Sequence, residues 1–431
     1  MKAGFYKIDI TPAAGIRMSG FGQRDREKAA TGVHDPLFAR ALYLQQGEQK
    51  AVILALDLLF LAREEVDRLK GAIGREMDMT PAQILINTSH THAGPKVDRW
   101  IYDPPPNELY LQQLQEKIVR SIAHARQNLR PVTISATVAK TSLPMNRRRK
   151  RKDNTVEEGL KPNPQGPVCD SLPVCLLRDN EGKPVCLLFS VSCHPSTTHE
   201  FEFSADFPGP ATERLDNFLG HECSLFLQGC GGDAKSRVIG EGEEEWRLGT
   251  WADVEESGRI VAEEVIDALK DLKTLKPDLQ SRIVEMYWPL HVNRTAADFY
   301  AIANSNESDK TWHLFAEEKL KILQRGVQLP LTVPVILHGL KIADQLRFVG
   351  LEGEAVAELG LYLFDFYKNG VTFPLGYTDG TQLYLTTDDM IAEGGYEVTS
   401  YYQYRIPYPL AGSHMPLLRA ALSNMKANGI D

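Results

Sequence analysis

Two histidines one residue apart, His90 and His92, follow an apolar run that ends at Ile86. Gly94 and Pro95 then end the predicted strand. Because residues i and i+2 of a strand point to the same face, both imidazoles are expected to face one space. Neutral imidazole is a common ligand of zinc in proteins. The pair alone indicates a metal only weakly, since a chain with 11 histidines often contains such a pair by chance, and a structural role for either histidine stays open.

Three further segments place polar side chains directly after apolar strands. His194 follows one such strand, and two strand-end histidines at one rim are typical of sites in α/β proteins. Gly232 and Asp233 follow another, where glycine either lets backbone N–H groups approach a ligand or forms a plain tight turn. Glu354 is predicted to open a helix, where the helix dipole stabilises an ionised carboxylate.

Tyrosines and charged loops complete the set of residues that could act in a site. Tyr384 and Tyr396 border a glycine-containing segment, and their residue type alone predicts packing groups. The basic run 147–152 and the acidic segment 240–246 are expected to lie in solvated loops rather than at domain boundaries.

Strands and helices alternate from end to end, which predicts an α/β fold with mixed sheets flanked by helices. No low-complexity linker divides the chain, so residues 1–431 are expected to form one large catalytic-type domain. The expected strands cover residues 1–10, 41–45, 51–56, 84–90, 131–140, 173–177, 184–191, 224–228, 281–290, 333–340 and 345–351. The expected helices cover residues 62–77, 107–128, 210–219, 254–272, 295–325 with a break near 304–306, and 354–366.

The composition limits the classes of function. A net charge of -9 on 431 residues argues against nucleic acid as the main partner. The chain has no apolar run of about 18 residues, which predicts no transmembrane helix, and its N-terminus lacks the apolar region of a secretory signal. Six cysteines without a C-x-x-C spacing are expected to be reduced and buried. These features predict a cytoplasmic protein with a small-molecule substrate, and homo-oligomerisation stays open.

Together, these landmarks resemble the catalytic domain of the neutral/alkaline ceramidase family. The resemblance extends from I-D-I-T-P at residues 8–12 to residue 397, and includes G-V-H-D-P-L-F-A-R-A at 32–41 and H-T-H-A-G-P at 90–95. It implies one bound zinc ion. The implied ligands form a nitrogen- and oxygen-rich set that suits zinc, namely His90, His194, Glu354 and Tyr384.

The resemblance also implies which residues meet the substrate. His92 and Tyr396 match residues that bind or polarise the substrate carbonyl. Asn146 and Arg147 match an N-R motif whose arginine lines the same pocket. Within the basic run, Arg147 is therefore expected to be functional, whereas residues 148–152 are expected to be solvated.

Lys235 marks the main departure from the family pattern. Ceramidases carry a serine two residues after the G-D of this turn, and here Lys235 takes that place, with Ser236 one position later. Lys235 is expected to orient an acidic or hydroxyl-rich substrate, which Gly232 and Asp233 would help to bind. The chain also ends without the C-terminal immunoglobulin-like domain that the family appends, which is a further expected difference.

These patterns predict a zinc-dependent hydrolase that cleaves an amide or ester bond with metal-activated water. The replacement of the serine favours a small, soluble substrate over ceramide. Two other interpretations stay open: a metal-dependent hydrolase or lyase acting on a carbohydrate or lactone, and a non-catalytic homologue that binds a metal or ligand.

Overall fold

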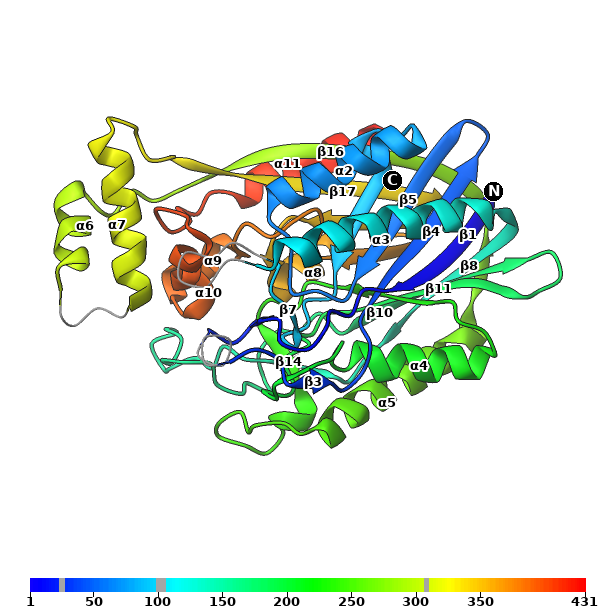
Figure 1. Cartoon of the computed structure of the whole chain (residues 1–431), viewed down its shortest axis with the longest axis horizontal. Coiled ribbons are helices and arrows are strands. Elements are labelled where there is room, and N and C mark those ends of the chain that lie inside the picture. The colour runs from blue at the N-terminus through cyan, green and yellow to red at the C-terminus, as the bar shows by residue number, and fades with distance from the viewer. Residues whose placement is uncertain (23–27, 98–105, 306–309) are drawn as a thin grey trace.

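A nine-stranded mixed sheet forms the centre of the molecule (Figure 1). The computed structural model describes residues 1–22, 28–97, 106–305 and 310–431. The strands of the large sheet lie side by side in the order β13 (Ser224–Gln228), β11 (Pro184–Val191), β10 (Ser171–Asp179), β8 (Arg130–Lys140), β1 (Lys2–Asp9), β4 (Phe38–Gln46), β5 (Gln49–Leu56) and β6 (Ile84–Thr88), with β15 (Lys273–Leu275) paired to β8.

A second, four-stranded sheet packs against one face of the first. Leu42 and Leu44 of β4 share a hydrophobic core with Leu340 and Phe348 of the second sheet. Tyr43, between the two leucines, belongs instead to a core on the opposite face, as the two-residue period of a strand requires. The strands of this sheet are β16 (Pro277–Pro289), β17 (Thr332–Ala343), β18 (Leu346–Leu351) and β20 (Val371–Leu375).

Helices cover the outer faces of both sheets. The apolar sides of α2 and α3 pack on the β4–β5 half of the large sheet, those of α4 and α5 on the β10–β11 half, and those of α8 and α11 on the second sheet. This arrangement confirms the predicted fold class of mixed sheets flanked by helices. The helices are α2 (Arg63–Met77), α3 (Glu108–Gln127), α4 (Pro208–Leu219), α5 (Trp251–Ala268), α8 (Ala357–Phe366) and α11 (Met415–Ala427).

Three parallel strand pairs are each joined by a crossover that contains a helix. They are β5–α2–β6, β11–α4–β13 and β18–α8–β20. Parallel strands end at the same edge of a sheet, and the crevice beyond their carboxyl ends is where open α/β sheets bind ligands. The polar residues singled out in the sequence follow these strands.

The strand that leads to the first histidine is shorter than predicted. β6 ends at Thr88, and His90 has a left-handed backbone with φ of 65°. The N–H groups of Ser89 and His90 donate to the carbonyls of Leu56 and Leu58, at 2.8 and 2.9 Å. The prediction that strand alternation aligns His90 with His92 was therefore wrong, because a loop carries both residues.

Glu354 does not open a helix. It lies in the two-residue strand β19 (Glu354–Ala355), which pairs in parallel with β21 (Tyr384–Leu385), and Glu354 is registered with Tyr384. Helix α8 begins only at Ala357. The helix-dipole argument for this carboxylate was therefore wrong, and strand pairing holds Glu354 beside Tyr384.

The segment predicted as one broken helix over 295–325 forms two helices, α6 (Ala296–Ala303) and α7 (Lys310–Gln324). They project from the body of the molecule at the left of Figure 1. The predicted break covers residues 304–306, of which 306 lies outside the described residues. All six cysteines are buried and free. Among the described helices, none is long and apolar enough to cross a membrane.

Candidate metal centre

Backbone carbonyls fix the imidazoles of two buried histidines. Nδ1 of His90 lies 2.8 Å from the carbonyl oxygen of Leu59, and Nδ1 of His194 lies 2.7 Å from that of Gly231. Because a carbonyl oxygen can only accept, each Nδ1 carries a proton, and Nε2 is the atom that the neutral imidazole offers to a metal. Carbonyl acceptors that set the tautomer in this way are typical of metal-binding histidines.

The carboxylate of Glu354 meets both of these Nε2 atoms. Its Oε2 lies 3.2 Å from Nε2 of His90 and 3.2 Å from Nε2 of His194. One carboxylate oxygen and two imidazole nitrogens therefore meet at one place.

His194 cannot supply a proton between itself and Glu354. Nη1 of Arg147 lies 3.4 Å from Nε2 of His194, and a guanidinium can only donate. Burial, followed by the charge of Arg147, lowers the pKa of His194 to about 3. A lone pair and a carboxylate oxygen thus face each other at 3.2 Å. A cation between them would turn this unfavourable contact into a favourable one, so these donors fit a metal such as zinc.

His92 brings a third imidazole to the same place. Its Nε2 lies 3.2 Å from Nε2 of His90, and the ligand atoms of His90, His92 and His194 all lie within 4.8 Å of one another. His92 is half-buried, whereas the other two are fully buried. The geometry therefore places His92 on the accessible side, where it can serve as a third nitrogen ligand or contact a substrate.

Tyr384 and Arg147 form the wall behind His194. The Tyr384 hydroxyl lies 3.5 Å from Nε2 of His194 and accepts a hydrogen bond of 2.9 Å from Nη2 of Arg147. Burial, despite Arg147, holds the pKa of Tyr384 well above its ordinary value. The ring of Tyr396 packs edge-on against Tyr384 at 5.6 Å, and its hydroxyl donates to Gln403 at 2.9 Å. The structure thus brings all the implied ligands together, with Tyr396 next to them.

Arg148 is buried and does not belong to a solvated run. Its guanidinium donates to Glu397 Oε2 at 2.7 Å, while Nε of Arg147 donates to Glu397 Oε1 at 2.9 Å. The prediction that Arg148 is solvated was wrong because one buried carboxylate pairs with both arginines. Lys150, by contrast, is exposed as predicted.

Comparison with known proteins identifies the fold. No protein-family model and no curated protein matches this sequence. The structure is similar to that of neutral ceramidase from Pseudomonas aeruginosa, with a TM-score of 0.72 and 15% sequence identity over 96% of this chain and 75% of that chain. This chain has the neutral ceramidase fold. A ceramidase complexed with C2 gives a TM-score of 0.71 and 16% identity over 98% of this chain and 74% of that chain.

The ceramidase fold agrees with the resemblance drawn from the landmarks, and it gives the turn after β13 a clear structural role. Gly232 donates its N–H to the carbonyl of Ala355 at 2.8 Å, and a Cβ on Gly232 would lie 2.6 Å from the carbonyl oxygen of Glu354. The carboxylate of Asp233 accepts from Asn146 Nδ2 at 3.0 Å and from the N–H of Ala357 at 2.7 Å. Both residues position the walls of the centre, and their predicted contact with a substrate stays a prediction.

Lys235 lies directly beside a proposed ligand in this ceramidase fold. It belongs to β14 (Ala234–Ser236), and its side chain is buried. Its backbone forms an isolated parallel β-bridge with that of His194. Burial, followed by the charge of Arg147, lowers the pKa of Lys235 to about 8. Ser236 does not replace the missing serine as a nucleophile, because its hydroxyl is buried and lies 2.8 Å from that of Ser257 on α5.

Sequence reasoning missed two tyrosines that contact Glu354. Tyr377 donates to Glu354 Oε2 at 3.3 Å, and its ring packs on His90 with 4.3 Å between centroids. Tyr404 donates to Glu354 Oε1. The φ of 49° at Tyr377 reflects a tight turn that its sequence does not announce. The tyrosine-rich segment 401–404 gives a packing signal only, so neither residue was predictable.

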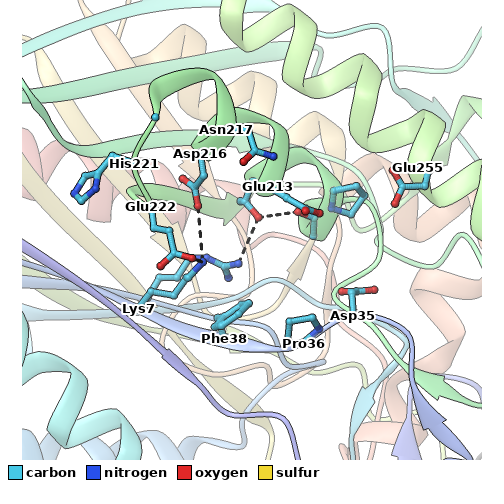
Figure 2. A pocket seen from close by; sticks show the side chains of 15 residues that line it. Lys7, Asp35, Pro36, Phe38, Glu213, Asp216, Asn217, His221, Glu222 and Glu255 are labelled. Atoms are coloured by element: carbon cyan, nitrogen blue, oxygen red, sulfur yellow. Dashed lines mark hydrogen bonds and ion pairs between the residues drawn. The ribbon is translucent and has the colours of Figure 1, made fainter.

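A surface groove lies away from this centre. Figure 2 shows a groove of about 730 Å³ whose lining comes mainly from β1, β4 and α4. Its charged groups largely satisfy one another: Lys7 pairs with Glu222 at 2.9 Å and with Asp216 at 3.8 Å. Arg40 donates to Thr212 at 3.4 Å. The groove therefore does not compete with the histidine centre as the candidate site.

Proposed function

We propose that this protein is a zinc-dependent hydrolase that cleaves an amide or ester bond in a small, polar substrate. The observation that carries the proposal is the convergence of Nε2 of His90, Nε2 of His194 and Oε2 of Glu354 at 3.2 Å, with both Nδ1 protons given to backbone carbonyls. The fold supports it, since the similar solved structures are a neutral ceramidase and a ceramidase complexed with C2.

The side chains of the centre would have separate roles in such a reaction. When bound, zinc supplies Lewis acidity that lowers the pKa of a water molecule to about 7. His90, His194 and Glu354 would hold the ion, with Tyr384 as the fourth ligand. His92 would donate a hydrogen bond to the oxygen that gains charge in the transition state, and Tyr396 would do so once its hydroxyl turns from Gln403 to the substrate. Each such donor contributes about 3 kcal/mol.

Arg147 keeps this arrangement in place. It donates to the Tyr384 hydroxyl and lies 3.4 Å from His194, and Glu397 balances its charge. The guanidinium is buried, so its hydrogen bonds and charge are directed at the proposed ligands and not screened by bulk solvent. In this proposal Arg147 orients Tyr384 and keeps His194 unprotonated, ready to bind the ion.

Lys235 supports a polar substrate. With a pKa of about 8 it is mostly charged at pH 7, and the described residues give its ammonium no hydrogen bond, only the face of Trp246 at 5.2 Å. A buried ammonium lacking such a partner favours a ligand that supplies one. We therefore propose a carboxylate or a hydroxyl on the substrate near the scissile bond.

Replacing Lys235 with methionine is expected to lower kcat/KM about 10- to 100-fold for a substrate with a carboxylate or hydroxyl near the amide. The expected loss reflects one charge-assisted hydrogen bond. The rate on a matched substrate with a methyl group at that place should stay within about threefold of the wild type. Equal losses on both substrates would contradict the role of Lys235 in recognition.

A hydrolysis screen tests the proposed function. N-acyl amides, esters and lactones, together with a short-chain ceramide, would be incubated with zinc-loaded and with chelator-treated protein. We expect zinc-dependent cleavage of at least one small polar amide or ester, at a higher rate than cleavage of the ceramide. Cleavage that survives complete removal of metal would contradict the proposal.

A cytoplasmic location is part of the proposal. It is supported by six cysteines that are all buried as free thiols, as is usual in a reducing compartment.

A further inference from the structure

The two oxygens of Glu354 have different surroundings. Oε2 lies 3.2 Å from Nε2 of His90 and 3.2 Å from Nε2 of His194, whereas Oε1 accepts a hydrogen bond from the hydroxyl of Tyr404. A carboxylate that binds a metal through both oxygens needs both of them free on the metal side. Tyr404 engages Oε1, whereas Oε2, which meets the two imidazoles, accepts only the longer hydrogen bond of 3.3 Å from Tyr377 among the described residues.

Tyr404 stands at the rim of the centre, not deep beneath it. Its side chain is half-buried, and its ring centroid lies 6.3 Å from that of Phe60 and 6.0 Å from that of Tyr384. It ends the 3-10 helix η4 (Ser400–Tyr404), after which Arg405 takes a left-handed backbone with φ of 64°. Such a turn fixes the direction in which the Tyr404 side chain leaves the backbone.

The projecting helix α7 holds this turn in place. Lys319 donates to the carbonyl oxygen of Arg405 at 2.7 Å, and Glu318 accepts from the Arg405 guanidinium at 2.6 Å. The ring of Trp312 stacks on Tyr402 with 4.1 Å between centroids and an angle of 21°. Figure 1 shows α6 and α7 next to the segment that leads into η4, which contains α9 (Asp388–Glu393) and α10 (Tyr396–Thr399). Helix α7 therefore braces the residues on both sides of Tyr404.

We propose that Tyr404 is a positioning residue of the metal centre, which restricts Glu354 to binding the ion through Oε2 alone. This inference rests on the proposed function. Without Tyr404, the described residues would leave only the 3.3 Å hydrogen bond from Tyr377 to Oε2 to oppose a rotation of the carboxylate that shares both oxygens with the ion. Hydrogen bonds from outer residues to a ligating carboxylate commonly affect metal affinity 10- to 100-fold.

The test compares Tyr404→Phe with wild-type protein and with Tyr408→Phe. Tyr408 is buried in the hydrophobic core against which Tyr404 packs, and its ring contacts Phe299. Its variant therefore controls for the loss of one tyrosine hydroxyl in that core. Zinc affinity would be measured by competition with a chromophoric chelator. The visible absorption of the cobalt-substituted protein would report the number and geometry of ligands.

We expect Tyr404→Phe to bind zinc about 10- to 100-fold more weakly, with a cobalt spectrum shifted towards a higher coordination number. Tyr408→Phe should match the wild type in both measurements. Unchanged affinity and spectrum in a folded Tyr404→Phe protein would overturn the inference while leaving the proposed function intact. Failure of the wild type to bind zinc or cobalt would overturn the proposed function, and this inference with it.

Discussion

His194→Ala is expected to lose its metal and to lower hydrolysis by about 1000-fold or more. His194 sits between Glu354, Tyr384 and Arg147, so its removal takes one ligand and separates the others. The Lewis acidity that a bound metal supplies contributes several kcal/mol, and each 1.36 kcal/mol corresponds to a tenfold change in rate. Metal content by mass spectrometry and the initial rate on the best substrate of the screen check this result.

A matched control separates the loss of a ligand from the loss of any histidine. His291 is exposed on the link between β16 and α6, and within the described residues only its backbone is hydrogen-bonded, to Pro409. His291→Ala should keep its metal and its rate within about twofold. If His194→Ala keeps both metal and activity, His194 is not a ligand and the assignment of the centre is wrong.

Asp379→Asn is expected to lower the free energy of unfolding by about 3–5 kcal/mol, the largest effect on stability that we predict. Asp379 is fully buried and lies 2.7 Å from the ammonium of Lys70 and 2.6 Å from Nδ1 of His338. The substitution leaves a buried ammonium without its counter-charge. The same carboxylate accepts from the N–H of Ile86 at 3.1 Å, so it also ties β6 to the turn that carries Tyr377.

The pH dependence of stability provides a second signature of Asp379. Burial alone would raise the pKa of Asp379, but Lys70 and His338 lower it to about 2, below the value of about 4 in the unfolded chain. A lowered folded-state pKa means that the stabilisation is complete above about pH 4 and is lost as the pH falls towards 2. Urea unfolding across this range should show the loss in the wild type, and a smaller loss in Asp379→Asn.

Asp365→Asn is the control for this pair of measurements. Asp365 is exposed and only 4.0 Å from Lys368, so its surface ion pair should contribute at most about 1 kcal/mol. An Asp379→Asn protein that is as stable as Asp365→Asn would show that the buried charge cluster does not stabilise the fold.

The sequence predicted which residues converge at the centre better than it predicted their geometry. His90, His194 and Glu354 were accessible to sequence reasoning because each follows an apolar strand, and the carboxyl ends of parallel strands meet at one edge. The local conformations differ, however, because His90 lies in a left-handed turn and Glu354 in a two-residue strand. Such features depend on contacts between distant segments.

The sequence did not reveal the residues that hold the proposed ligands in place without being proposed as ligands themselves. Arg148 looked like part of a solvated basic run, and only the fold places Glu397 against it. Tyr377 and Tyr404 were not singled out in the sequence. They contact Glu354 only because the pairing of β19 with β21 and the brace from α7 bring together segments far apart in the chain. Patterns with a short period cannot encode such long-range contacts.

Metal analysis of the purified protein tests the central claim most directly. The protein would be stripped with a chelator, reloaded with zinc, freed of excess metal and analysed by mass spectrometry, alongside Glu354→Gln. The account predicts about one zinc per chain in the wild type and a clear loss in Glu354→Gln. A folded wild-type protein that holds no zinc after reloading would contradict it.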